Sequence, residues 1–315
     1  MKLISASSPH IRSSFRTDRI MLDVVLALLP ALAVGIYVHG IRAVLIALVS
    51  IGSAVAAEYL FCLANRIQTT VQDCSAIVTG LLLAMTLPVS VPIWLAVTGA
   101  VFAILFVKCL CGGLGQNIFN PALAARAFML LLFPAGMTCY TVSGADAVSS
   151  ATPLHHMVIP ALPEEPLSHM FLGLIPGSIG ETSALALLLG GAYLVFRKVI
   201  TVRIPAAYLG TVAVLTLVFH KTDAPVGWML YNLLGGGLML GAIFMATDYS
   251  SSPVTAKGQW IYGFGCGTLT VLFRYFGLYP EGVTYAILIM NALSWFFDRH
   301  TGSRRFGTGK GGSSA

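Results

Sequence analysis

Long apolar segments separated by short polar connections make up most of this 315-residue chain. Ten of these segments are predicted to be helices that cross or enter a membrane. Several are shorter than the ~20 residues that a straight spanning helix needs, which indicates tilted helices or helices buried among neighbours. The predicted spans are Ile20–Val38, Ala43–Ala64, Ser75–Pro88, Val91–Val107, Asn120–Pro134, Ser183–Phe196, Ile204–Phe219, Val226–Thr247, Trp260–Phe276 and Val283–Phe297.

The predicted spans form two groups of five on either side of the longest polar connection, Ala135–Thr182. A group of five spans ends on the opposite side of the membrane from where it began. The second group therefore begins on that opposite side and is expected to be inverted relative to the first. A short echo agrees: residues 79–86 (TGLLLAMT) in the third span resemble residues 240–247 (LGAIFMAT) in the eighth. Chance similarity between apolar segments remains the alternative. If the echo is real, the functional centre lies where these two spans meet, near the membrane midplane.

This pattern predicts an all-α integral membrane protein built from two inverted five-helix repeats. The expected segments are an N-terminal arm (1–19), a first membrane repeat (20–134), a connecting loop (135–182), a second membrane repeat (183–297) and a C-terminal tail (298–315). The Gly- and Ser-rich end of the tail, from Gly307, is expected to be flexible.

Composition supports the membrane interpretation. Hydrophobic residues make up 57% of the chain and charged residues only 10%, against about 25% in soluble domains. With the N-terminus in the cytoplasm, fourteen of the 18 basic residues lie inside, three lie outside and Arg126 lies within a span. This bias follows the positive-inside rule and places both termini in the cytoplasm and the 135–182 loop outside. It also explains the net charge of +6 without a nucleic-acid partner.

A glycine-rich segment from Gly112 to Asn120 precedes the predicted fifth span. Glycines allow backbone amides to approach a ligand closely, and Pro121 is suited to the first turn of a helix whose positive end faces the segment. The glycine spacing does not match a dinucleotide fingerprint. One interpretation makes Gly112, Gly113, Asn117 and Asn120 a wall for a flavin-like ring, and the other makes the segment a tight turn.

Four ionisable residues lie within or beside the apolar spans: Asp23, Glu58, Arg126 and Asp248. Charged groups are costly in lipid, so these side chains should face the bundle interior or reach an interface. Asp23 and Asp248 lie near span ends and are expected at the interface. Glu58 and Arg126 are the better candidates for an interior pair or an ion path.

The sequence predicts neither a metal site nor a catalytic residue. His155, His156 and His169 lack a Cys or carboxylate at the usual zinc spacing, so they are expected to be ordinary loop residues. Cys109 and Cys111 are too close together for the usual two-residue redox or zinc spacing. Nothing in the chain has the pattern of a Ser-His-Asp triad or a P-loop.

The segment from Asp146 to Leu154 is a polar island in the outer loop, with hydroxyls on Ser149, Ser150 and Thr152. Considered alone, it could be an ordinary surface loop. However, Asp146-x-x-Ser149-Ser150-Ala151-Thr152 resembles the flavinylation motif Asp-x-x-Ser-Gly-Ala-Thr, in which the last hydroxyl is esterified by the phosphate of FMN. Together with residues 112–128 and the opening of the first span at residues 19–24, the motif resembles the RnfD/NqrB family across nearly the whole chain.

The resemblance implies a membrane subunit of an ion-translocating respiratory complex. The short N-terminal arm is more similar to the RnfD branch, of the ferredoxin:NAD oxidoreductases, than to the NqrB branch. The resemblance implies covalent FMN on Thr152, with Asp146, Ser149, Ser150 and Ala151 forming the attachment motif. It also allows for a second, non-covalent flavin, riboflavin, nearer the cytoplasmic side. Ser150 departs from the motif's usual glycine, so any need for positive φ there would be harder to meet.

The resemblance also implies partners and a location. The partners would be the flavinylated G subunit, the iron–sulfur subunits and the NAD-binding C subunit of an Rnf-type complex, with a flavin transferase for maturation. The location would be the bacterial inner membrane, and the chain would be a redox subunit of a translocase rather than a stand-alone enzyme. The rival hypotheses are a polytopic solute transporter or channel and a structural scaffold, neither of which would carry a flavin.

Overall fold

The computed structural model describes residues 17–67, 69–138, 166–173, 177–181, 183–277 and 282–302. These residues form helices and connections, with one isolated β-bridge between Pro88 and Ser178. The helices of the first half are α1 (Thr17–His39), α2 (Ile41–Ala64), η1 (Val71–Asp73), α3 (Ser75–Thr86), α4 (Ile93–Phe102), the π-helix η2 (Ala103–Cys109), α5 (Pro121–Leu132) and α6 (Pro134–Met137). Those that follow are α8 (Leu167–Leu172), α9 (Ala184–Phe196), α10 (Arg203–Val218), α11 (Pro225–Leu234), α12 (Leu238–Leu240), the π-helix η3 (Gly241–Met245), α13 (Ala256–Phe276) and α14 (Val283–Thr301).

Each predicted span has a helical counterpart, but the helices differ in length. Among the described residues, α1 and α2 are long and apolar enough to cross a membrane by themselves, and α11 with α12–η3 would be a third if counted as one bent span. In contrast, α3 and α5 have 12 residues each, about 18 Å against a hydrocarbon core of about 30 Å. Nearly every residue of α3 is buried, so this short helix is surrounded by protein rather than lipid.

The eighth predicted span, Val226–Thr247, is not one straight helix. It is divided into α11 and the α12–η3 segment, which are bent by 62° relative to each other. The break lies at the Gly235-Gly236-Gly237 run, where Gly236 and Gly237 have φ values of 68° and 64°. Residues with a side chain rarely adopt this left-handed conformation, so the glycines permit the turn that separates the two helices.

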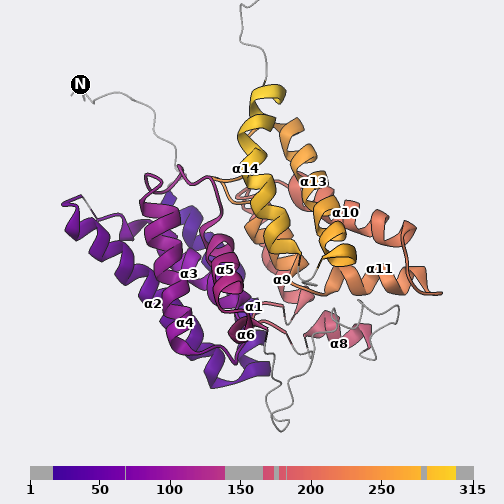
Figure 1. The fold of residues 1–315 in the computed structure, drawn as a ribbon, viewed down its shortest axis with the longest axis horizontal. Helices are drawn as coiled ribbons and strands as arrows, with labels where there is room; N and C mark the ends of the chain where they lie inside the picture. Colours follow the sequence, from indigo (N-terminus) through magenta and orange to yellow (C-terminus); the bar gives the residue numbers. More distant parts are fainter. Residues whose placement is uncertain are drawn as a thin grey trace, which may run out of the picture.

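Helices at corresponding positions in the two halves pack against corresponding neighbours. Within the first half, α2 packs on α3 and α4, and α5 packs on α3 and α4. Within the second half, α10 packs on η3 and α13, and α14 packs on η3 and α13. Between the halves, α1 packs on α9 and α5 on α14, so helices at the same position in each half meet. Figure 1 shows the indigo-to-magenta half beside the orange-to-yellow half.

The helices that join the halves run antiparallel. Asp23, near the start of α1, bonds to Arg197, which caps the end of α9. The backbone nitrogen of Asn120, which caps the start of α5, lies 3.2 Å from the side-chain amide of Asn291 in the middle of α14. Farther along α5, Arg126 shares a small cavity with Thr284 in the first turn of α14.

Large apolar side chains cover the outside of the helices. On α2, for example, Leu45, Leu48, Leu60 and Leu63 are all exposed. A soluble monomer rarely exposes apolar surface on this scale, whereas a protein surrounded by lipid does so routinely. The all-helical fold and this apolar exterior are those of a membrane protein.

Candidate functional site

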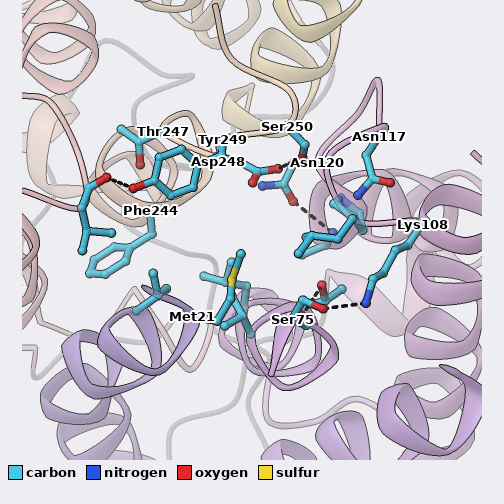
Figure 2. Close-up of a pocket in the computed structure, with 18 of the residues that line it drawn as sticks. Met21, Ser75, Lys108, Asn117, Asn120, Phe244, Thr247, Asp248, Tyr249 and Ser250 are labelled. Carbon is cyan, nitrogen blue, oxygen red and sulfur yellow. Dashed lines mark hydrogen bonds between the residues drawn. The ribbon is translucent and has the colours of Figure 1, made fainter. Parts of the chain in front are cut away.

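A cavity between the two halves is the candidate site. It contains about 710 Å³ of empty space, including space open to solvent. Its lining comes from α1, α3, the end of η2, the connection before α5, the end of α9 and the residues around the end of η3 (Figure 2). The third and eighth predicted spans, which carry the sequence echo, therefore do meet: Thr79 and Leu82 of α3 face the same cavity as Phe244 and Thr247.

The lining combines an apolar wall with a polar one. Side chains from α1, α3, α9 and η3 provide the apolar surface: Met21, Val24, Val78, Leu82, Leu194 and Phe244. Most polar groups come from the end of η2, the connection before α5 and the segment after η3, and Ser75 comes from the start of α3. The polar lining residues are Ser75, Lys108, Asn117, Asn120, Thr247, Asp248 and Ser250. A site of this kind suits a flat, partly apolar ligand with hydrogen-bonding groups along one edge.

The glycine-rich segment contributes to the cavity through its asparagines. Asn117 and Asn120 line it, whereas Gly112 and Gly113 do not. Gly112, Gly113 and Gly115 instead have positive φ values of 109°, 93° and 89°, and these shape the turn between η2 and α5. Both interpretations of the segment therefore describe part of it: the glycines make a tight turn, and the turn presents the asparagines to the cavity.

Both polar atoms of the Asn120 side chain bond to the protein. Its Oδ1 accepts hydrogen bonds from the backbone nitrogens of Ala122 (3.0 Å) and Leu123 (3.3 Å), so it is the N-cap of α5. Its Nδ2 donates to the carbonyl oxygen of Met245 at 3.2 Å, which ties α5 to the end of η3. Asn120 thus fixes the wall of the cavity more than it offers groups to a ligand.

Asn117 differs from Asn120. Its side chain is 4% exposed, and its Oδ1 has no hydrogen-bond partner among the described residues. An amide oxygen that is buried without a partner loses its hydrogen bonds to water and gains none from the protein. This lowers the free energy of unfolding by about 1–3 kcal/mol. Asn117 also lines the cavity, so its amide is a polar group beside the ligand space whose oxygen has no partner in the described protein.

A buried ion pair lies at one edge of the cavity. Lys108 Nζ is 2.7 Å from Glu58 Oε1 and donates a second hydrogen bond to Ser75 Oγ at 2.7 Å (Figure 2). The Lys108 and Glu58 side chains are 3% and 1% exposed, and Thr70 also donates to Glu58 Oε1. Glu58 was expected to face the interior, and it does. However, its partner is Lys108 rather than Arg126.

Arg126 lies elsewhere, in a small cavity on α5 lined also by Thr86, Gly236 and Gly237. The sequence placed Lys108 just beyond the fourth span, in a polar connection. In the structure the π-helix η2 extends the fourth span to Cys109, so Lys108 is inside the bundle. π-Helical turns are rare in proteins, but those that occur often lie at functional sites. No signal in the sequence marks this one.

The two carboxylates expected at the interface are packed against other groups. Asp23 Oδ2 accepts from Arg197 Nη2 at 3.1 Å, and Oδ1 accepts from Tyr193 Oη at 2.9 Å, so Asp23 joins α1 to α9. Asp248 follows η3, lines the cavity and accepts hydrogen bonds from Ser250 and Ser251 at 3.0 and 3.2 Å. Burial raises the pKa of the Asp248 carboxyl above its ordinary value, and these hydrogen bonds act in the opposite direction.

The sequence motif for flavin attachment, Asp146, Ser149, Ser150, Ala151 and Thr152, lies outside the described residues, as do His155 and His156. His169 is in α8. Within the described parts of the chain, no group of three or more His, Cys, Asp or Glu side chains could hold a metal ion.

Comparison with known proteins identifies relatives along the whole chain. The sequence model of the NQR2, RnfD, RnfE family matches residues 4–307. The D subunit of the Na(+)-translocating ferredoxin:NAD(+) oxidoreductase complex of Acetobacterium woodii is 46% identical, covering 98% of this chain and 97% of the relative. The D subunit of the proton-translocating ferredoxin:NAD(+) oxidoreductase complex of Clostridium ljungdahlii is 42% identical, covering 96% of both. The D subunit of the ion-translocating oxidoreductase complex of Stutzerimonas stutzeri is 40% identical, covering 94% and 93%.

Proposed function

This chain belongs to the NQR2, RnfD, RnfE family, and from that premise we propose that it is the D subunit of an ion-translocating ferredoxin:NAD oxidoreductase complex. The observation that carries the proposal is 46% identity to a D subunit over nearly the full length of both chains. Relatives named for sodium and for proton translocation match almost equally well, so the proposal covers ion translocation without choosing the ion.

We propose that the protein relays electrons through flavin and is not an enzyme by itself. The described residues are almost entirely helices in an apolar bundle, so the contacts with ferredoxin and NAD are assigned to other subunits. These would be the iron–sulfur subunits, the NAD-binding C subunit and the flavinylated G subunit. Covalent FMN on Thr152 would require a flavin transferase that recognises Asp146–Thr152, and the support for it is the sequence motif.

We propose that the cavity between the halves holds the second, non-covalent flavin, riboflavin. A flavin ring has an apolar dimethylbenzene end and a polar edge with one N–H donor and two carbonyl acceptors. The cavity residues fit this pattern, with Val78, Leu82 and Phe244 on the apolar side and Asn117 and Lys108 on the polar side. The bound ring would supply electron transfer, while the protein holds its orientation and limits its contact with water.

Asn117→Leu tests the cavity assignment. The variant is expected to weaken riboflavin binding about tenfold, because the amide proposed to hydrogen-bond the polar edge of the ring is lost. It should leave thermal stability unchanged or slightly higher, since Oδ1 has no partner in the described protein. Flavin released by denaturation measures the non-covalent pool, and the exposed Asn65→Leu is the control. Full retention of releasable flavin in Asn117→Leu would place riboflavin elsewhere.

Two inverted repeats in the inner membrane complete the proposal, with both termini in the cytoplasm and the 135–182 loop outside. Three features support inversion: the matching neighbours of the halves, the antiparallel pairs α1–α9 and α5–α14, and a basic residue near the end of the fourth span of each half that bonds to the third span. Lys108, near the end of the fourth span, reaches Ser75 at the start of α3. Arg274, near the end of α13, donates at 2.9 Å to the carbonyl of Gly235, just before α12. The positive-inside bias supports the orientation.

Purification of the tagged chain from its own membranes tests the proposed function. The other subunits of a ferredoxin:NAD oxidoreductase are expected to co-purify with it, and deletion of the chain should abolish membrane-bound ferredoxin:NAD oxidoreductase activity. Reintroduction of the unaltered chain is the control. A chain that purifies alone, with oxidoreductase activity intact in the deletion strain, would favour the transporter or scaffold hypotheses.

A further inference from the structure

An apolar groove runs along the outer face of the second half, between α10 and α13. It contains about 990 Å³ of empty space, including space open to the surroundings of the protein. Its floor is made of small residues of α10, and its wall of large residues of α13: Ala206, Ala207, Gly210, Thr211, Trp260 and Phe264 are among the lining residues. From Ala206 to Val214 the groove extends about 12 Å along the helix axis.

The groove is open to the surroundings of the protein. Trp260, Phe264 and Val214 are 52%, 60% and 61% exposed. A Cβ atom added to Gly210 would meet no other atom within 4 Å, so the floor is uncovered at its midpoint. In a bilayer an exposed apolar face of this kind would contact acyl chains, and a groove about 12 Å long suits part of one chain.

Two exposed cations lie at one end of the groove. Arg203 is one helical turn before Ala206 on α10, and Lys257 is one turn before Trp260 on α13. Arg203 Nη1 donates to Gln259 Oε1 at 3.3 Å, so its guanidinium is held toward the start of α13. Neither helix contains an Asp or Glu, and the carboxylate of nearby Asp298 accepts from the backbone nitrogens of Val254 and Thr255.

We propose that this groove binds an anionic glycerophospholipid of the surrounding membrane. One acyl chain lies along Ala206–Val214, and the phosphate headgroup lies between Arg203 and Lys257. Basic residues beside a pocket between transmembrane helices favour anionic headgroups. Trp260 is in the second turn of α13, so it would lie near the membrane interface, where aromatic residues are enriched. The charges select the headgroup, and the groove selects the lipid over free phosphate.

Native mass spectrometry of the purified complex with added lipid tests the proposal. Phosphatidylglycerol is expected to be retained in preference to phosphatidylcholine. Arg203→Gln with Lys257→Gln should weaken phosphatidylglycerol binding about fivefold for each charge removed. Lys257→Gln alone keeps the Arg203–Gln259 contact and should show the single fivefold loss. The control removes two exposed cations of the first half, Arg42→Gln with Arg66→Gln, and should retain the lipid.

Gly210→Leu tests the groove itself. A Cβ at this position meets open space and a leucine side chain would occupy the floor of the groove, so lipid retention should fall while the complex stays intact. Gly52→Leu is the matched control, because Gly52 is a glycine on the face of α2 whose Cβ would also meet open space. Equal binding of phosphatidylcholine, or unchanged retention in both the charge and Gly210 variants, would overturn the proposal. Crosslinking of Gly210→Cys to another protein of the complex would also overturn it, because a partner helix would then occupy the groove.

Discussion

Thr152→Ala is expected to abolish covalent flavin on this protein completely. The hydroxyl of Thr152 is the group that the phosphate of FMN would esterify, and alanine has nothing to replace it. The denatured band of the unaltered protein should fluoresce under ultraviolet light, and that of the variant should not. The unaltered protein should exceed its polypeptide mass by the mass of FMN minus one water, which the esterification releases. The variant should have its polypeptide mass alone. Electron transfer through the complex should fall with the loss of the flavin.

Two further variants separate attachment from folding. Thr138→Ala removes a hydroxyl outside the motif, just after α6, and should keep the fluorescence. Ser150→Gly restores the usual residue of the motif and should flavinylate at least as well as the unaltered chain. A matured protein with only its polypeptide mass would refute the flavin assignment. Labelling that places a cysteine at position 152 in the cytoplasm would refute the topology on which an exported transferase depends.

The sequence predicts the helical segments well because they are apolar throughout, whether their side chains face lipid or the interior of the bundle. Predicted Ser75–Pro88 became α3 (Ser75–Thr86), and predicted Val283–Phe297 became α14, which continues to Thr301. The break in the eighth span has a signal in the three glycines at 235–237. That signal is not decisive, because glycines are also frequent in unbroken transmembrane helices.

The partners of the charged residues could not be read from the sequence. Asp23 and Arg197 are 174 positions apart, and Glu58 and Lys108 are 50 apart. Hydropathy places such residues inside or beside a span but does not say which helix faces which. The π-helix η2 also extends the fourth span past Lys108, so this side chain is buried in the bundle instead of lying in the polar connection. The asparagines at 117 and 120 were found because the connection before α5 is unusually polar.

Removing either member of the buried pair Glu58–Lys108 is expected to destabilise the protein by about 3–5 kcal/mol. Lys108→Met leaves the carboxylate of Glu58 buried with only the hydroxyl of Thr70, and Glu58→Gln leaves the ammonium of Lys108 without a counter-charge. The double variant removes both charges and should recover most of the stability. Unfolding in detergent with increasing denaturant measures all three variants against the unaltered chain.

The pair Asp23–Arg197 provides the matched comparison, because it is also an ion pair between helices but is far more exposed. Its N–O distance is 3.1 Å, and the Arg197 side chain is 50% exposed, against 3% for Lys108. Water already screens such a pair, so Arg197→Gln should lower the free energy of unfolding far less than Lys108→Met does. If Lys108→Met cost no more than Arg197→Gln, or if the double variant were no more stable than the single ones, the Glu58–Lys108 pair would not be a buried ion pair. Its charges would then be solvated through the cavity beside them, and the polar wall proposed for riboflavin would be wet.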